Sequence, residues 1–193
     1  MVQKIARVLN VLITAALVCN LIILYLVPAI VLVYQDVSLL EGVREYVSGI
    51  LFPGEDDIVM AGIFAPAVIW VSGWFEMDAY SVVLALFLVF SGIQTAVILK
   101  QARRVLATIR KGRPFSMENA VSLNRAALCC FIIAAAALIR VVFSVCYYRS
   151  ALPLASYNAL FVPLFAMAGL LCLVMAALFR QAAELKAEND LTI

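Results

Sequence analysis

Apolar residues in this chain are gathered into four long stretches that are separated by polar connections. The stretches run approximately over Val8–Tyr34, Ala79–Leu99, Ala126–Tyr148 and Tyr157–Phe179. A helix needs about 20 apolar residues to cross the ~30 Å hydrocarbon core of a bilayer, and each stretch reaches that length. Because a backbone in lipid must satisfy its own hydrogen bonds, the stretches are predicted to be helices rather than strands. The pattern predicts an all-α integral membrane four-helix bundle, with residues 1–193 forming a single transmembrane domain.

The basic residues lie almost entirely on one side of these four spans. They occur before the first span, in the second connection and after the fourth span: Lys4, Arg7, Lys100, Arg103, Arg104, Arg110, Lys111, Arg113, Arg125, Arg180 and Lys186. The first connection contains only Arg44 and the third only Arg149. By the positive-inside rule, the N and C termini and the second connection are predicted to be cytoplasmic.

The long first connection carries two further apolar segments. Ser38 and Glu41 have the spacing of a capping box, and the apolar residues of 38–50 recur at helical intervals, which predicts a short amphipathic helix on the outer leaflet. Residues 58–75 form an apolar run of nearly spanning length, interrupted by Gly and Pro. We expect this run to be interfacial or re-entrant, since the alternative, a fifth span, would force one terminus to the wrong side.

The second connection has strong helix start and stop signals. The second span is predicted to continue as a helix through residues 100–111, with Gly112 at the position after its end and Pro114 preventing its continuation. Ser116 is a candidate N-cap for the next helix, which would run unbroken into the third span. The fourth span is likewise predicted to continue through residues 180–188. The helical hairpin formed by the second and third spans would then extend a turn or two beyond the inner leaflet.

Composition excludes a water-soluble globule and gives little support to catalysis. Hydrophobic residues make up 66% of the chain and charged residues 13%, with a mean hydropathy of +1.09. The chain contains no histidine, its five cysteines show no C-x-x-C spacing, and no nucleotide-binding or hydrolase motif is present. We therefore expect a non-enzymatic protein with no metal, no cofactor and no direct contact with nucleic acid.

Arg140 is the one charged residue inside a predicted span. It lies eight residues before the outer end of the third span, which is about 12 Å along a helix. A charge at membrane depth costs about 3 kcal/mol on insertion scales and marks a candidate functional site. Arg140 either extends to the outer interface near Asn158, or binds an anionic ligand or pairs with an outer acid such as Asp78. Both interpretations stay open at this point.

The segment Gly112-Arg113-Pro114-Phe115-Ser116-Met117-Glu118-Asn119 resembles a G-x-P-F-s-x-x-n signature. This signature belongs to a family of small bacterial membrane proteins known as domain of unknown function 2975. The C-terminal residues 184–193, which end in Leu-Thr-Ile, are similar to that family's closing pattern, and the four-span layout matches it. The outer segment 36–78 departs most, because it is long and apolar for the family.

The resemblance implies a protein of the bacterial cytoplasmic membrane and a regulatory role. Family members are often encoded beside a small helix-turn-helix regulator, so the resemblance implies a membrane partner that holds or releases such a regulator. The residues expected to contact it lie in the second connection and the tail: Arg110, Gly112, Pro114, Phe115, Asn119, Leu191, Thr192 and Ile193. The alternative is a transport or small-molecule-binding subunit that uses Arg140, Asn158 and Asp78 for an anionic ligand. The sequence leaves the oligomeric state open.

Overall fold

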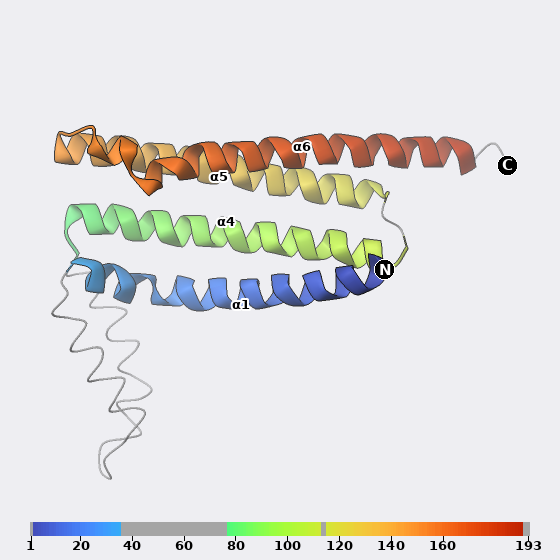
Figure 1. Ribbon diagram of the computed structural model, residues 1–193, viewed down its shortest axis with the longest axis horizontal. Coiled ribbons are helices and arrows are strands. Elements are labelled where there is room, and N and C mark those ends of the chain that lie inside the picture. Colours follow the sequence, from blue (N-terminus) through green and yellow to red (C-terminus); the bar gives the residue numbers. More distant parts are fainter. Residues whose placement is uncertain (1, 36–76, 113–114, 191–193) are drawn as a thin grey trace, which may run out of the picture. The chain divides into compact units, whose positions relative to one another are not determined.

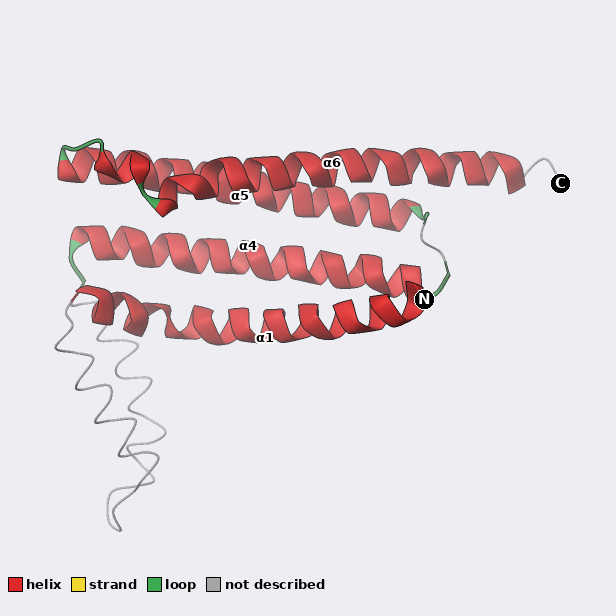
Figure 2. Cartoon of the chain, viewed as in Figure 1, coloured by secondary structure: helices red, strands yellow, loops and turns green. Residues whose placement is uncertain are grey.

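The computed structural model describes residues 2–35, 77–112 and 115–190, and everything regular in these ranges is helical. The long helices are α1 (Val2–Gln35), α4 (Ala79–Arg110), α5 (Met117–Tyr148) and α6 (Tyr157–Asp190), shown in Figures 1 and 2. A 3₁₀ turn, η1 (Leu152–Ala155), connects α5 to α6. Within the described ranges, four helices are long and apolar enough to cross a membrane. The prediction of an all-α protein with four spanning helices is confirmed.

All four of these helices are longer than a bilayer requires. Each of α1 and α6 has 34 residues, and each of α4 and α5 has 32. At 1.5 Å per residue a helix of this length is about 50 Å long, against ~30 Å of hydrocarbon. The predicted continuations of the second, third and fourth spans as helix are therefore confirmed. The predicted outer segments 38–50 and 58–75 lie outside the described residues, and the orientation of the termini stays a prediction.

The chain divides into two compact units, which are described separately. The smaller unit covers 23–89, and its described part joins the end of α1 to the beginning of α4. Val27, Val31 and Ala85 are fully buried there, and Leu84 and Leu88 pack against them. Pro28 is also buried, and α1 continues through it as helix.

The larger unit contains the antiparallel pair formed by α5 and α6, which lie side by side in Figure 1. On α5 the small residues Ala126, Cys130 and Ala134 are all buried, as their four-residue spacing predicts for a face that packs on another helix. The two helices approach closely at Gly169 of α6, where an added Cβ would lie 3.0 Å from the ring of Phe131. The glycine thus allows α6 to pack directly against an aromatic side chain of α5.

Candidate functional site

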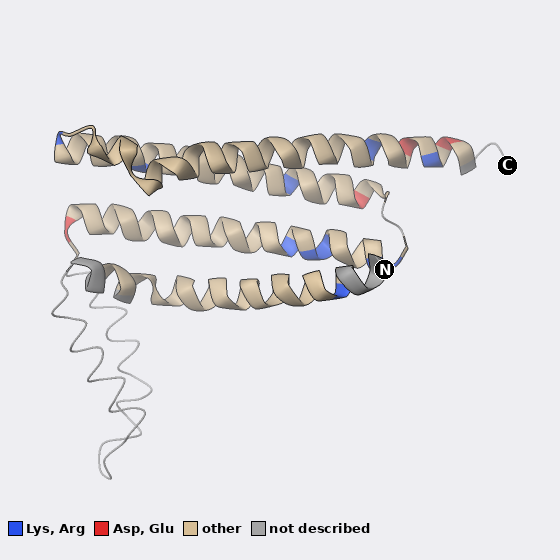
Figure 3. Ribbon diagram, viewed as in Figure 1, with Lys and Arg blue, Asp and Glu red and all other residues tan. Residues whose placement is uncertain are grey.

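Three side-chain hydrogen bonds of the larger unit lie at the end where α4 finishes, α5 begins and α6 carries its charges. We call this region the hairpin end and define it as Val105–Gly112, Phe115–Arg125 and Leu173–Asp190. Figure 3 shows the charged residues of α6 gathered toward its C-terminal part. The sequence-predicted partner residues fall in this region, except that Pro114, Leu191, Thr192 and Ile193 lie outside the described residues.

The turn that ends α4 is formed as the sequence predicts. The N–H groups of Lys111 and Gly112 donate to the carbonyls of Thr108 (3.1 Å) and Ile109 (3.1 Å), which tightens the last turn. Gly112 has φ +74°, a left-handed conformation that costs an L-residue about 1–2 kcal/mol. Arg110 is the last residue of α4 and is exposed.

The beginning of α5 differs from the expected capping in one respect. Ser116 occupies the N-cap position with φ −130° and ψ 147°, and its carbonyl accepts the N–H of Asn119 at 3.0 Å. Its side chain makes no capping hydrogen bond, and the buried Ser116 Oγ has no partner among the described residues. The position was predicted correctly, while the side-chain bond that normally accompanies it is absent from the described structure.

Asn119 has an internal role that its sequence position did not reveal. Its side chain is only 1% exposed, and its Oδ1 accepts a hydrogen bond from the hydroxyl of Thr108 at 2.6 Å. This bond joins the last turns of α4 to the first turn of α5. Asn119 was predicted as a partner contact, but its burial in this conformation makes it a residue that fixes the hairpin. Thr108 was missed, because nothing in the sequence marks which polar residue of α4 faces α5.

Phe115 connects the hairpin to α6. Its ring lies 5.8 Å from the ring of Phe179, centroid to centroid, at an interplanar angle of 50°. Such a tilted pair is a favourable aromatic geometry. Phe115 is nevertheless 52% exposed, so one part of it packs internally and the other is available to a partner.

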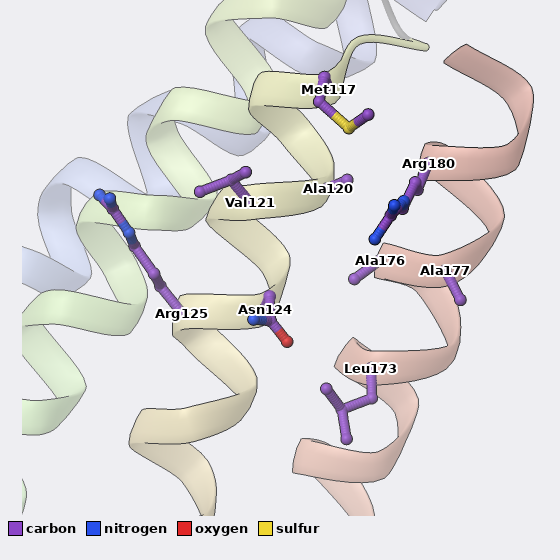
Figure 4. Close-up of a pocket in the computed structure, with 9 residues that line it drawn as sticks. All are labelled: Met117, Ala120, Val121, Asn124, Arg125, Leu173, Ala176, Ala177 and Arg180. Atoms are coloured by element: carbon purple, nitrogen blue, oxygen red, sulfur yellow. The ribbon is translucent and has the colours of Figure 1, made fainter. Parts of the chain in front are cut away.

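A groove of ≈ 460 Å³ lies between the first turns of α5 and the C-terminal half of α6. We call it the α5–α6 groove; it is lined by Met117, Ala120, Val121, Asn124, Arg125, Leu173, Ala176, Ala177 and Arg180 (Figure 4). The side chains of Met117, Asn124 and Arg180 point into the space between the two helices, while that of Arg125 extends away from α6. Sequence analysis did not identify this groove. The available signal was that Asn124-Arg125 directly precede the third span and Arg180 directly follows the fourth.

The residues proposed for an anionic ligand are placed as follows. Arg140 is buried, with 8% of its surface exposed, and its carbonyl accepts the hydroxyl of Ser144 at 2.9 Å. Asn158 is half-buried in the first turn of α6. Asp78 immediately precedes α4, and its carboxylate accepts the N–H of Ser81 at 2.9 Å, which is the geometry of an N-cap. Asp78 and Arg140 belong to different compact units, so their pairing stays a prediction.

The family model described as "Protein of unknown function (DUF2975)" matches residues 71–193, which is more than half of the chain. The chain belongs to this family. The DUF2975 match includes α4, α5 and α6, and therefore the whole hairpin end and Arg140. Residues 36–70 of the outer segment precede the match. Searches of curated proteins and of solved structures found no significant match.

The DUF2975 signature has a structural explanation in this chain. Gly112 supplies the left-handed residue after α4, Ser116 starts α5, and Asn119 bonds back to α4. Phe115 packs on α6. The signature therefore shapes the connection between the second and third spans of this multi-pass membrane protein.

Proposed function

We propose that this protein is a non-enzymatic membrane partner that docks a small helix-turn-helix transcription regulator on its hairpin end, in the cytoplasm of a bacterial cell. The single observation that carries the proposal is the continuation of α6 beyond the apolar span. Residues 180–190 extend it by 11 residues, or about 16 Å. A helix that leaves the membrane in this way presents a rigid surface to a soluble partner.

The exposed residues of the hairpin end support a protein partner. Leu185 is 66% exposed on the extension of α6, Phe115 is 52% exposed and Met117 is 45% exposed. On the same extension Arg180 and Glu184 form an exposed i,i+4 ion pair with an N–O distance of 2.9 Å. Apolar and aromatic anchors within a polar rim are the usual composition of a protein–protein interface.

Two sequence features favour regulation over catalysis. The chain has no histidine and none of the common catalytic motifs. Five of its 14 basic residues, Arg110, Lys111, Arg125, Arg180 and Lys186, lie in the hairpin end, which by the positive-inside rule is expected to face the cytoplasm, where a transcription regulator is found.

Leu185 gives the sharpest test of this proposal. The parent protein, extracted from host membranes in mild detergent and affinity-purified, is expected to recover a small DNA-binding protein in stoichiometric amount by mass spectrometry. Leu185→Glu should lower that recovery by about tenfold or more, because a carboxylate buried in place of an apolar anchor removes the anchor's contribution to the binding free energy. Deleting 191–193 should have the same direction of effect.

Leu152 provides the matched control, since it is 78% exposed and lies in η1, at the other end of the α5–α6 pair. Leu152→Glu should leave recovery unchanged. Phe115→Ala is a less specific test of partner binding, because it also removes the internal contact with Phe179. Retention of the regulator by Leu185→Glu, or its absence from the parent preparation, would refute the docking proposal.

The burial of Arg140 supports a second candidate, in which the protein binds or transports a small anion. An arginine with 8% exposure is not lying open to lipid, and buried arginines in membrane proteins commonly bind anions or line pathways. Uptake, or thermal stabilisation by a panel of small organic carboxylates and phosphates, should be lost in Arg140→Ala and partly kept in Arg140→Lys. Equal responses of the parent protein and Arg140→Ala would show that Arg140 does not bind the anion and has a structural role.

A further inference from the structure

The α5–α6 groove lies where the apolar parts of both helices end. Arg180 is the first charged residue after the apolar stretch Tyr157–Phe179, and Asn124 and Arg125 directly precede the stretch Ala126–Tyr148. This is the level at which hydrocarbon gives way to lipid headgroups. A groove at this depth, open between two membrane helices, is accessible to lipid.

The lining of the groove combines apolar and polar side chains. Leu173 and Val121 border it with aliphatic side chains, and Ala176 and Ala177 leave room between the helices. Arg180 and the amide of Asn124 supply the polar groups. The arrangement suits a molecule with a hydrocarbon part and an anionic, hydrogen-bonding part.

The guanidinium of Arg180 has hydrogen-bond donors available for an anion. Its Nε donates to Glu184 Oε1 at 2.9 Å, and the terminal guanidinium nitrogens project over the groove. A guanidinium carries five N–H donors and matches the oxygens of a phosphate in pairs. The groove also includes Met117 and Ala120 of the first turn of α5, where the helix dipole contributes a positive partial charge.

We propose that the α5–α6 groove binds an anionic phospholipid such as phosphatidylglycerol, with its phosphate on Arg180 and an acyl chain along Leu173, which lies farther inside the apolar stretch of α6. Basic pockets between membrane helices at the cytoplasmic side are a common form of headgroup site. The volume of ≈ 460 Å³ is within the usual range of about 300–1,000 Å³ for small-molecule sites. This inference stands independently of the docking proposal.

Native mass spectrometry of the purified protein in a neutral detergent tests the site directly. The protein is titrated with short-chain phosphatidylglycerol or phosphatidylcholine, and phosphatidylglycerol is expected to bind preferentially. Arg180→Gln should weaken phosphatidylglycerol binding by about tenfold, as expected for loss of a charged hydrogen-bond donor. Lys186→Gln removes the same charge from α6 outside the groove and should keep near-parent affinity.

Glu184→Gln gives a change of the opposite sign. It removes the carboxylate that holds Arg180 and repels a phosphate, so phosphatidylglycerol should bind about threefold more tightly. Ala177→Leu narrows the groove without changing charge and should weaken binding of the lipid. The loss of binding in Ala177→Leu requires a site at the groove, because a general attraction to basic surface would not respond to a change of shape without a change of charge.

Three results would overturn the proposal. Equal binding of phosphatidylglycerol and phosphatidylcholine would remove the role of the charge. An equal loss in Arg180→Gln and Lys186→Gln would reduce the effect to general electrostatics. Full competition by inorganic phosphate or glycerol 3-phosphate would make the occupant a soluble anion and refute the assignment to lipid.

Discussion

The hydrogen bond between Thr108 and Asn119 is predicted to stabilise the hairpin between α4 and α5. The Thr108 hydroxyl lies 2.6 Å from Asn119 Oδ1 and 2.7 Å from the carbonyl oxygen of Val105. A hydroxyl has one proton, so the two oxygens compete for it. The two single substitutions should therefore have unequal effects.

Thr108→Val removes the hydroxyl while Asn119 stays 1% exposed, so a buried amide oxygen loses its donor from α4. We expect the free energy of unfolding to fall by about 2 kcal/mol, within the 1–3 kcal/mol cost of such a loss. Asn119→Ala leaves Thr108 the carbonyl of Val105 as an acceptor, so the loss should be nearer about 1 kcal/mol. The coupling energy of the double-mutant cycle should be about 1 kcal/mol.

Equilibrium unfolding in mixed micelles, with SDS as denaturant and helical circular dichroism as signal, measures these differences. Thr95→Val is the matched control, since Thr95 is also on α4 and its hydroxyl donates to the carbonyl of Ser91 at 2.8 Å. That substitution breaks a local bond alone and should change stability by less than about 0.5 kcal/mol. A Thr108→Val effect no larger than that of Thr95→Val, or a coupling energy near zero, would refute the role of this bond.

Three further predictions concern backbone conformation and helix packing. Gly112 has φ +74° and an added Cβ would meet no atom within 4 Å, so the cost of a substitution comes from the backbone conformation alone. Gly112→Ala should therefore lower the free energy of unfolding by about 1 kcal/mol and Gly112→Asn by less. The same SDS titration measures both. Gly169→Leu should lower the free energy of unfolding by about 1–3 kcal/mol, because the new side chain overlaps the Phe131 ring. Adding Phe131→Ala should restore part of that stability; a double variant no more stable than Gly169→Leu would show that the strain does not come from Phe131. Cys130 is buried on α5 and Cys172 is half-buried on α6, which packs against α5, so mild oxidation with copper–phenanthroline is expected to link them, as peptide mapping would show; a product with neither joined would contradict the expected packing.

The positions of the helices were predictable because they depend on length and polarity alone. A span of about 20 apolar residues has one stable form in lipid, and Gly112 and Pro114 mark the break between the second and third helices regardless of tertiary contacts. The same reasoning predicted the continuation of α6 past Phe179. These are local properties, which the order of residues determines directly.

The roles of individual polar side chains were less predictable, because they depend on how each helix is rotated. Asp78 was considered as a partner for Arg140, and this pairing stays a prediction; its carboxylate also accepts the N–H of Ser81 at the start of α4. An Asp just before an apolar run is a helix-start signal that could have been recognised. No comparable signal distinguishes the buried Asn119 from the exposed Asn124, since both precede the third span by a few residues.

Arg140 illustrates the same difference between position and environment. The sequence established its depth, and from depth alone an arginine that extends to the interface and one that binds an anion are both reasonable. Its 8% exposure shows that it is sheltered rather than open to lipid. Burying an arginine costs free energy unless its hydrogen-bond donors are matched. We therefore expect Arg140→Ala to lower the free energy of unfolding far more than Arg149→Ala, because Arg149 is exposed.

The internal roles of the signature residues change where a partner contact should be sought. Gly112, Ser116 and Asn119 determine the conformation of the hairpin, and Asn119 offers no surface to a partner. Residues that determine the conformation of a turn act on its shape, and Asn119, being buried, cannot by itself choose among partners. We therefore expect the specificity of docking to lie in exposed positions outside the signature, above all Leu185 and its neighbours on the extension of α6. Substitutions there should exchange one partner for another, whereas substitutions in the signature should weaken every interaction of the hairpin end together.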